Sequence, residues 1–390
     1  MLLRLLRFTV IVTIVVAYSG CDESSKSRMD NTNVLIDFVE EKFAPDRRVA
    51  IFDISMELTD GVLSVSGVSD QPVAIKYLLD TMAGKGYRVA NNVRILPDST
   101  VGEKLFGVIN NSVGNMRYAP KHSAELVTQA LLGTIVKIKR IYGEWCQIQT
   151  PDGYIAWIDH GGVQLVTAGE AVSWKNADKV LVTVPVANVK INPWSNKVVS
   201  DVVMGGKLKL VSKEEKYFEV EYPDGRKGII EKKYAQRYFD WKSDLKPDGN
   251  LVESYARQLM GIPYLWGGTS TKGVDCSGFT KTVFMMNGLI IPRDASQQVQ
   301  AGISIEPGKN FENLKKGDLV FFGKPETDTT KQKTTHVGIW LGKQEFIHSS
   351  QRVKLGSFDS ESDLFDEINL NRFLEAKRLL GDKIPGVRPY

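Results

Sequence analysis

Apolar and polar positions along residues 32–98 follow two periods, which predicts a small α+β unit. Apolar residues recur at helical spacing in NVLIDFVEEKF and in PVAIKYLLDTMAGKG, and the second segment ends at Gly84 and Gly86. The segments RVAIFDISMEL, GVLSVSGV and YRVANNVRIL alternate as strands do. We find no candidate chemistry in this unit and interpret it as a spacer or docking module, within a segment 22–103 that also holds a polar tether.

A repeated pattern of short strands and tight turns follows. The segment GTIVKIKRIYGEWCQIQTPDGYIAWI, from Gly133, aligns without a gap with GGKLKLVSKEEKYFEVEYPDGRKGII, which begins 72 residues later at Gly205. Apolar positions coincide, and Pro-Asp-Gly, a hairpin turn signal, falls at the same place in both copies. We therefore predict two small β-barrels, over residues 104–168 and 170–240, which resemble bacterial SH3-like domains.

The two copies differ in chemistry at matching positions. An anionic and aromatic set in the first copy is replaced by a cationic and aliphatic set in the second. These residues are Glu125, Tyr154 and Trp157 in the first copy and Lys197, Arg226 and Ile229 in the second. A carboxylate beside aromatic rings is suited to holding a substrate ammonium group. The alternative is that these are ordinary surface residues of a barrel.

The last predicted domain covers residues 250–390 and follows a polar linker, YFDWKSDLKPDGN. Its pattern predicts two helices first, in LVESYARQLM and CSGFTKTVFMMNG, separated by the loop GIPYLWGGTSTKGVD. Strands follow in GDLVFFG, THVGIWLG and EFIHSS. The fold class of the whole chain is therefore predicted as α+β.

Composition supports several soluble domains and argues against one class of partner. The chain has 390 residues, of which 42% are hydrophobic and 25% charged, so it is long enough for more than one core. Its formal net charge of +4 is small for this length, and basic residues are interspersed with acidic ones. We therefore predict no nucleic-acid partner.

The N-terminus has the layout of an export signal. In MLLRLLRFTVIVTIVVAYSGC, two arginines precede an apolar run too short to cross a membrane permanently, and small residues follow. Ser19 and Gly20 before Cys21 resemble the lipobox of bacterial lipoproteins, although Tyr18 departs from the usual Leu. We predict a signal peptide over residues 1–21, a lipid anchor on Cys21 and a periplasmic or cell-envelope location. A plain cleaved signal is the alternative.

Cysteine usage draws attention to one residue. Of three cysteines in the chain, Cys146 lies in the alternating segment GEWCQIQT and is predicted to be buried in a strand. If Cys21 is lipidated, Cys276 is a free thiol in an oxidising compartment. It opens a predicted helix, where N–H groups favour a thiolate, and Asp275 can cap that helix. The alternative is a buried small hydrophobic residue.

Two of the four histidines lie in one predicted hairpin, HVGIWLGKQEFIHSS. With the turn at residues 342–344, Gly338 faces His348 and His336 faces Ser350. The two histidines are then diagonal neighbours on one face, with Gly338 leaving room between their rings. The residues that alternate with them are expected in the core: Val337, Ile339 and Leu341.

This arrangement suits a cysteine nucleophile served by a base and an orienting group. His336 would deprotonate Cys276 and later protonate the leaving amine, while His348 would fix the tautomer of His336. A zinc site built from the same three residues is the rival hypothesis, but it lacks a paired cysteine or a His-x-x-x-His spacing. We predict neither a metal ion nor a cofactor.

Several motifs in this domain carry a resemblance to a known family. GIPYLWGGTSTKGVDCSGF, GDLVFF, HVGIWLG and FIHSS, in this order, resemble the signature of the NlpC family of papain-like bacterial cell-wall cysteine peptidases. The preceding SH3-like pair resembles the branch that cleaves γ-D-glutamyl bonds to a diamino acid in murein peptides. The resemblance implies Tyr264 near the oxyanion and a pocket lined by Asp275, Ser277 and Ser296. It also implies that Glu125, with Tyr154 or Trp157, grips the amine of an N-terminal L-alanine.

The function expected from these features is cell-wall peptide recycling. Substrates would be free murein stem peptides of the type L-Ala-γ-D-Glu-diamino acid, cut after D-Glu through a thioester on Cys276. An amine anchor would restrict the enzyme to peptides already freed from glycan. Two alternatives remain open: an amidase or acyltransferase with the same chemistry, and a wall-binding lipoprotein with a vestigial catalytic domain.

Overall fold

The computed structural model describes the backbone of residues 22–390 and the side chains from residue 33 onward. The predicted signal peptide and the lipidation site at Cys21 lie outside the described residues. Contacts divide the chain into two compact units, Met1–Ile95 and Leu96–Tyr390. Among the described residues, no helix combines the length and apolar character needed to cross a membrane.

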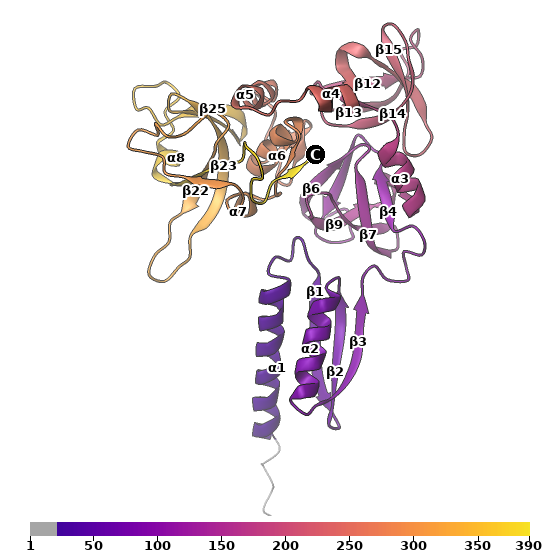
Figure 1. Ribbon diagram of the computed structural model, residues 1–390, viewed down its shortest axis with the longest axis vertical. Helices are drawn as coiled ribbons and strands as arrows, with labels where there is room; N and C mark the ends of the chain where they lie inside the picture. Colours follow the sequence, from indigo (N-terminus) through magenta and orange to yellow (C-terminus); the bar gives the residue numbers. More distant parts are fainter. Residues whose placement is uncertain (1–21) are drawn as a thin grey trace, which may run out of the picture. The chain divides into compact units, whose positions relative to one another are not determined.

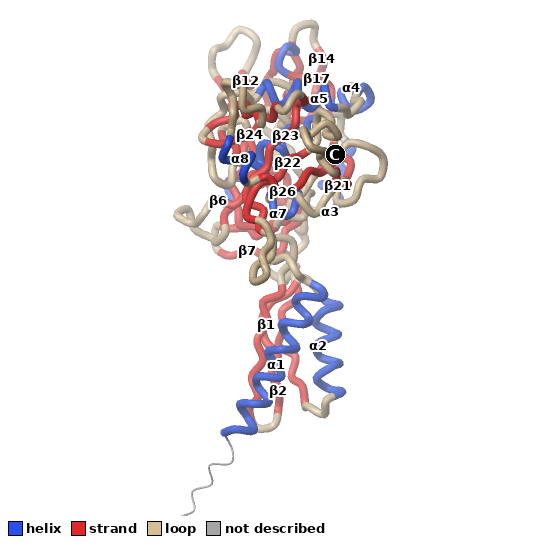
Figure 2. Tube along the Cα trace, turned by 90° about the vertical axis from the view of Figure 1, so that its left-hand side faces the viewer, coloured by secondary structure: helices blue, strands red, loops and turns tan. Residues whose placement is uncertain are grey.

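The first unit is the expected α+β layer. Its elements are α1 (Asp22–Phe43), β1 (Phe52–Thr59), β2 (Val62–Ser69), α2 (Pro72–Gly84) and β3 (Arg88–Ile95). β1 and β2 form an antiparallel hairpin, and α2 crosses over to bring β3 parallel to β2. Both helices lie on the same face of this sheet (Figures 1 and 2). The polar segment predicted as a tether is helical here, because α1 begins at Asp22.

Two seven-stranded sheets form the SH3-like modules of the second unit. The strands of the first are β4 (Phe106–Ile109), β5 (Val113–Arg117), β6 (Leu126–Leu131), β7 (Ile135–Tyr142), β8 (Trp145–Gln149), β9 (Ile155–Asp159) and β10 (Val163–Val166). Those of the second are β11 (Lys179–Val182), β12 (Val186–Lys190), β13 (Val198–Val203), β14 (Lys207–Lys213), β15 (Tyr217–Glu221), β16 (Lys227–Glu231) and β17 (Ala235–Arg237). Each module ends with a short 3-10 helix before its last strand, at His160–Gly162 and Lys232–Tyr234, and α3 (Ala168–Asn176) joins the two modules.

The strand order confirms the repeat that the sequence predicts. The orders are β10-β4-β7-β8-β9-β5-β6 and β17-β11-β14-β15-β16-β12-β13, which correspond strand by strand. Bulges fall at equivalent places, and the two Pro-Asp-Gly turns carry Gly153 and Gly225 at φ 96° and 87°. Neither sheet closes into the predicted barrel in the described residues, since the terminal strands pair on one side only. In the first module, β6 instead lies against a strand of the last domain.

One contact between the modules comes from a position that differs between the copies. Arg226, which stands where the first copy has Tyr154, donates from Nη2 to the main-chain oxygen of Asn110 at 2.9 Å. Its guanidinium also lies over the Tyr222 ring, 4.4 Å from the centroid.

The last domain has a six-stranded antiparallel sheet of order β21-β26-β22-β23-β24-β25. The helices are α4 (Tyr238–Asp244), α5 (Gly249–Gln258), α6 (Cys276–Met286), α7 (Ala295–Gln298) and α8 (Glu367–Asn371). The sheet strands are β21 (Ile303–Ile305), β22 (Leu319–Lys324), β23 (Lys333–Gly342), β24 (Glu345–Ser350), β25 (Arg352–Ser357) and β26 (Phe373–Arg378). Most helices precede this sheet in the chain, with α4 in the segment predicted as a linker, whereas α8 lies between β25 and β26. Short pairs are formed by β18 (Thr269–Ser270) with β19 (Gly273–Val274) and by β20 (Leu289–Ile290) with β27 (Arg388–Pro389).

Helix α6 lies in the core of this domain and contacts β23 and β24 (Figure 1). The predicted apolar positions Phe279, Val283, Phe284 and Met286 are all fully buried. A buried helix carrying the cysteine at its first residue therefore gives the site a rigid support.

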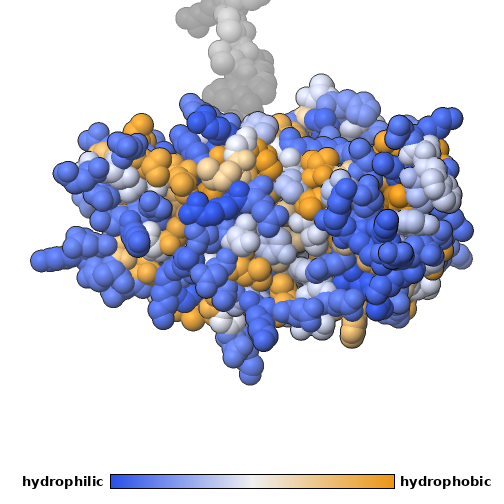
Figure 3. Space-filling model, turned by 90° about the horizontal axis from the view of Figure 1, so that it is seen from above, coloured by the Kyte–Doolittle hydropathy of each residue, from blue (hydrophilic) through white to orange (hydrophobic). Residues whose placement is uncertain are grey.

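The molecular face shown in Figure 3 is mostly hydrophilic, and its apolar residues lie in several small groups.

Candidate active site

Cys276 is the first residue of α6, and Asp275 caps that helix as the sequence predicts. The Asp275 Oδ1 accepts the backbone N–H of Gly278 at 2.7 Å. Gly278 has no side chain because a Cβ there would overlap the carbonyl oxygen of Gly268. The Cys276 sulfur accepts the backbone N–H of Val337, the residue after His336 on β23. Cys276 is only 7% exposed.

Behind the nucleophile, Asp275 forms a buried ion pair with Arg293. The carboxylate receives Arg293 Nη1 at 3.1 Å and Nη2 at 2.6 Å, and Arg293 is 1% exposed. Arg293 also donates to Ser277 Oγ at 3.0 Å and to Thr128 Oγ1, on the first SH3-like module, at 3.0 Å. Asp275 and Ser277 are thus parts of a buried polar network, and their direct contact with substrate stays a prediction.

The two predicted histidines lie together on one face of the sheet. His336 Nε2 and His348 Nδ1 are 2.8 Å apart, and the ring centroids are 5.0 Å apart. The pairing of Gly338 with His348 is confirmed, and the alternate residues of β23 face the core. The predicted pairing of His336 with Ser350 does not form, because the ladder between the strands ends at Gly338 and His348.

The hydrogen bond between the rings determines which nitrogen can act as the base. His336 uses Nε2 toward His348, so Nδ1 is the ring nitrogen that remains for another partner. A neutral His336 with a free Nδ1 carries its proton on Nε2 and donates it to His348 Nδ1. His348 then carries its own proton on Nε2, which is buried and lies 4.0 Å from Asp366 Oδ2.

Burial keeps both catalytic groups uncharged in the free protein. It raises the pKa of the Cys276 thiol to about 12, with a further increase from Asp275. It lowers the pKa of His336 to about 3, with a further decrease from His348. The expected thiolate at the helix N-terminus is therefore not the resting state, because desolvation outweighs the N–H groups of Val337 and Ser277.

Tyr264 is held beside the nucleophile by backbone hydrogen bonds. Its N–H donates to Gln351 O at 2.9 Å, and it forms a parallel bridge with Val274, two residues before Cys276. Burial raises the pKa of the Tyr264 hydroxyl to about 12, and the neighbouring Cys276 and Asp275 act in the same direction. The hydroxyl is therefore a neutral donor at pH 7.

The residues singled out in the first SH3-like module have different surroundings. Glu125 is exposed, and its Oε1 accepts the indole N–H of Trp266, in the loop that leads to Cys276, at 2.5 Å. Tyr154 is 6% exposed and lies close to Arg293. Burial lowers the pKa of Arg293, but Asp275, Asp294 and, less strongly, Tyr154 raise it above its ordinary value. Trp157 is covered by the Arg140 guanidinium, 5.2 Å from its ring centroid.

The remaining residues singled out in the sequence are a serine and a cysteine. Ser296 is exposed on α7, and Cys146 is buried in β8. Among the described residues, no group of three or more His, Cys, Asp or Glu side chains is arranged to hold a metal ion. His336 and His348 bond to each other instead of converging on one point, which does not suit the zinc hypothesis.

Three residues of the site were missed by sequence reasoning. Arg293 lies in PRDASQQ, the segment that holds Ser296, and Trp266 lies in GIPYLWGG, part of a motif quoted above, whereas Asp366 lies outside every motif. A buried arginine next to an aspartate-capped helix has no local sequence signal, because its partner is 18 residues away.

Comparison with known proteins agrees with this geometry. Residues 261–370 match the NlpC/P60 family, and residues 116–162 match the bacterial dipeptidyl-peptidase SH3 domain. A γ-D-glutamyl-L-lysine dipeptidyl-peptidase of Bacillus cereus is 33% identical over 233 residues, which cover 58% of this chain and 67% of that protein. Dipeptidyl-peptidase 6 of Lysinibacillus sphaericus is 26% identical over 268 residues, covering 65% of this chain and 92% of that protein.

A solved structure supports the arrangement of the domains. The crystal structure of an NlpC/P60 family protein from Bacillus cereus aligns with a TM-score of 0.61 and 26% identity, covering 71% of this chain and all of that one. The shared fold, the cysteine at the start of its helix and the histidine pair lead to one assignment. The chain belongs to the NlpC/P60 family of cysteine peptidases.

Proposed function

We propose that this enzyme hydrolyses the γ-D-glutamyl–diamino acid bond of free murein stem peptides that begin with L-alanine. The observation that supports this most directly is the contact between Glu125 and Trp266, which brings a carboxylate of the SH3-like module to the loop leading into Cys276. The relatives from Bacillus cereus and Bacillus subtilis that carry the name γ-D-glutamyl-L-lysine dipeptidyl-peptidase support the bond type.

In the proposed reaction, His336 takes the thiol proton as the Cys276 sulfur attacks the γ-carbonyl carbon of D-glutamate. The oxyanion is stabilised by the backbone N–H of Cys276 and the Tyr264 hydroxyl. The C–N bond then breaks, and His336 gives its proton to the leaving amine. Water, deprotonated by His336, then attacks the thioester carbonyl and the C–S bond breaks. His336 returns the proton to the Cys276 sulfur, and the γ-carboxylate of the dipeptide is released. In this proposal, the hydrogen bond from His336 Nε2 to His348 leaves Nδ1 as the nitrogen that exchanges protons with the sulfur.

The proposed amine anchor is Glu125 together with Tyr154. Tyr154 is preferred to Trp157 because it lies near the Arg293–Asp275 network behind the nucleophile, whereas an arginine already covers the Trp157 ring. An ammonium bound by a carboxylate forms a charge-assisted hydrogen bond. A stem peptide still amide-linked to glycan has no such ammonium, which is why we propose a recycling role.

A panel of defined muropeptides analysed by mass spectrometry tests this function. We expect the free tripeptide to be cut after D-Glu and its N-acetylated form to be cut at least about tenfold more slowly, the effect of one charged hydrogen bond. Glu125→Gln keeps the acceptor for Trp266 and should raise KM for the free peptide. Lys197→Gln, at the matching position of the second copy, is the control. Equal cleavage of both peptides would contradict the amine anchor, and amide or ester products would indicate an acyltransferase.

We also propose that the protein is exported and lipidated on Cys21, which gives it a membrane-anchored place in the cell envelope. The layout of residues 1–21 supports this. Fractionation of cells that express the full chain or Cys21→Ser tests it. The unmodified protein is expected in the membrane fraction and the variant in the soluble fraction, and membrane association of both would contradict lipidation.

A further inference from the structure

A cavity of about 670 Å³ lies in the second unit, away from the catalytic cysteine. Its walls come from both SH3-like modules, from α3 and α4, and from Ile290 and Tyr390 of the last domain. Ile290 follows the C-terminal end of α6, whereas Cys276 is at the N-terminal end. The 11 residues of this helix separate the two sites by about 16 Å.

The charged side chains that line this cavity are all cationic. They are Lys175, Lys179, Lys207 and Lys242, and no aspartate or glutamate is among the lining residues. The rest of the lining is largely apolar and aromatic and includes Trp174 and Tyr238. Such a cavity has the size of a small-ligand site and a positive potential.

Among the described residues, none of these four lysines forms an ion pair with an aspartate or glutamate, Lys207 included. The Lys207 ammonium lies over two rings, 4.2 Å from the Tyr390 centroid and 5.2 Å from that of Tyr238. By contrast, Lys179 donates to two main-chain oxygens, and Lys242 donates to a main-chain oxygen of Tyr390 at 2.8 Å. Asp178, the carboxylate nearest in sequence to Lys179, is 3.5 Å from Arg237.

The electrostatics of Lys179 and Lys207 agree with an anion-binding site. Burial lowers the pKa of Lys179 to about 8, and the charge on Lys207 lowers it further, although Asp178 acts in the opposite direction. Burial also lowers the pKa of Lys207. Two ammonium groups that destabilise each other in a low-dielectric cavity gain most from a shared anion.

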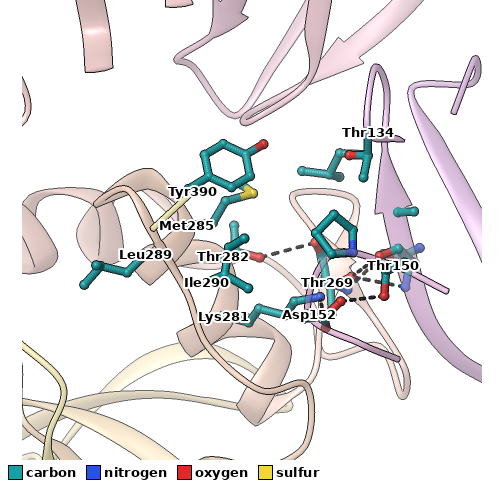
Figure 4. A pocket seen from close by; sticks show the side chains of 14 residues that line it. Thr134, Thr150, Asp152, Thr269, Lys281, Thr282, Met285, Leu289, Ile290 and Tyr390 are labelled. Carbon is teal, nitrogen blue, oxygen red and sulfur yellow. Dashed lines mark hydrogen bonds and ion pairs between the residues drawn. The ribbon is translucent and has the colours of Figure 1, made fainter. Parts of the chain in front are cut away.

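Tyr390 adds an independent observation. Its hydroxyl is buried and has no hydrogen-bond partner among the described residues. A smaller pocket beside the cavity shares Tyr390, Thr134 and Ile290 with it, and Figure 4 shows the Tyr390 hydroxyl directed toward the side on which Thr134 lies. An unsatisfied buried hydroxyl costs free energy unless a ligand or water bonds to it.

We propose that this cavity binds a small organic anion, with a carboxylate or phosphate held by Lys207 and Lys179 and an apolar body packed against the aromatic rings. The Tyr390 hydroxyl donates the further hydrogen bond. The site is separate from the catalytic centre and does not depend on the proposed peptidase function.

Isothermal titration calorimetry of the full chain tests this proposal by measuring the binding of four probes: phenyl phosphate, benzoate, inorganic phosphate and benzyl alcohol. We expect saturable binding of at least one of the two aromatic anions, and the tighter of them identifies the acidic group. Inorganic phosphate and benzyl alcohol, which each lack half of the proposed ligand, should bind at least about tenfold more weakly.

Variants separate this site from other cationic surfaces. Lys207→Met should weaken the aromatic anion at least about tenfold, and Tyr390→Phe should weaken it by a smaller factor with the fold unchanged. Lys232→Met is the control. It removes another ammonium of the second SH3-like module that lies over an aromatic ring, 5.6 Å from the Phe218 centroid, and it should not change binding. Cys276→Ala should bind as the unmodified chain does. Two results would overturn the proposal. One is failure of both aromatic anions to bind, and the other is that Lys207→Met and Tyr390→Phe bind the aromatic anion as tightly as the unmodified chain does.

Discussion

Burial of Cys276 and His336 sets how the nucleophile can react. With the thiol pKa raised to about 12 and the imidazole pKa lowered to about 3, neither group is charged at neutral pH. Proton transfer from sulfur to His336 must therefore accompany the attack on substrate instead of preceding it. A preformed ion pair would be reactive toward any small electrophile, whereas a neutral pair requires proton transfer during the attack.

Alkylation of Cys276 by iodoacetamide should rise steadily with pH. In a Cys21→Ser, Cys146→Ala background, where Cys276 is the remaining cysteine, we expect the rate to increase about tenfold per unit between pH 7 and 10, because only the thiolate reacts. The measurement is the rate of mass increase at each pH. A plateau already reached near pH 7 would show a preformed thiolate and contradict the neutral resting state.

Acid should destabilise the protein through its two buried histidines. Burial lowers the pKa of His336 from 6.5 to about 3 and that of His348 to about 4, although Asp366 acts to raise the latter. The unfolded chain therefore binds these protons first, and stability falls as the pH drops below 6.5, by roughly 1.4 kcal/mol per unit for each histidine.

Urea unfolding at pH 7 and pH 5 measures this effect. The loss of stability between the two values should be smaller in His336→Gln and in His348→Gln than in the unmodified protein. His160→Gln, an exposed substitution in the first SH3-like module, is the control and should leave the difference unchanged. Identical pH dependence in all four proteins would show that the buried pair is not the cause.

At the scale of elements, the hairpin of β23 and β24 positions the histidines through one small residue. A Cβ on Gly338 would lie 3.1 Å from the Phe346 ring, 3.2 Å from Ile347 O and 3.3 Å from His348 Cβ. These distances are shorter than ordinary contacts. Two of the neighbours cannot move freely, because one is the backbone oxygen of Ile347 and the other belongs to His348. Gly338 therefore allows His348 to reach His336.

Gly338→Ala should reduce activity more than it reduces stability. We expect kcat to fall by about tenfold or more, since small displacements of a catalytic group have large effects, while the free energy of unfolding falls by about 1–3 kcal/mol. Steady-state kinetics and urea unfolding measure the two quantities. Gly169→Ala, where a Cβ meets nothing within 4 Å, is the matched control. Unchanged kcat in Gly338→Ala would contradict this role.

Local patterns predicted most of these elements because they depend on neighbours in sequence. The register that pairs Gly338 with His348 follows from a turn only a few residues away, and the helix of Cys276 from its cap and apolar spacing. The strands β25 and β26 were missed because their sequences, RVKLGS and FLEAKR, mix polar and apolar residues in half-buried positions. Of the two, β25 is at the edge of the sheet and β26 lies between β21 and β22. Burial, and with it the neutral state of the thiol, depends on packing that the local sequence does not encode.

On the scale of the whole molecule, the first SH3-like module is joined to the catalytic domain by buried polar contacts. Gln129 and Thr269 exchange three hydrogen bonds of 2.9–3.1 Å across 140 residues. Lys281 of α6 pairs with Asp152 at 2.8 Å, with side chains 18% and 3% exposed (Figure 4). Contacts between residues this far apart could not be predicted from a single sequence, nor could the contact of Glu125 with Trp266.

Breaking the ion pair of Asp152 should destabilise the joined domains together. Burial raises the pKa of Asp152, but Lys281 and Thr150 outweigh it, so the carboxylate stays charged and its pKa lies below the ordinary value. Lys281→Met would leave that charge unpaired and should cost about 3–5 kcal/mol in urea unfolding. The double variant Asp152→Asn, Lys281→Met should recover most of the loss. A single variant as stable as the unmodified protein would contradict this role.

The contact between Arg226 and Asn110 limits what the second SH3-like module can do. The position that holds Tyr154 in one copy holds, in the other, a side chain that fastens the two copies to each other. Grafting Glu and Tyr onto the second copy would therefore not create another recognition surface. It would weaken the contact between the two modules, because this edge of the second module lies against the first module and not at the proposed site of cleavage.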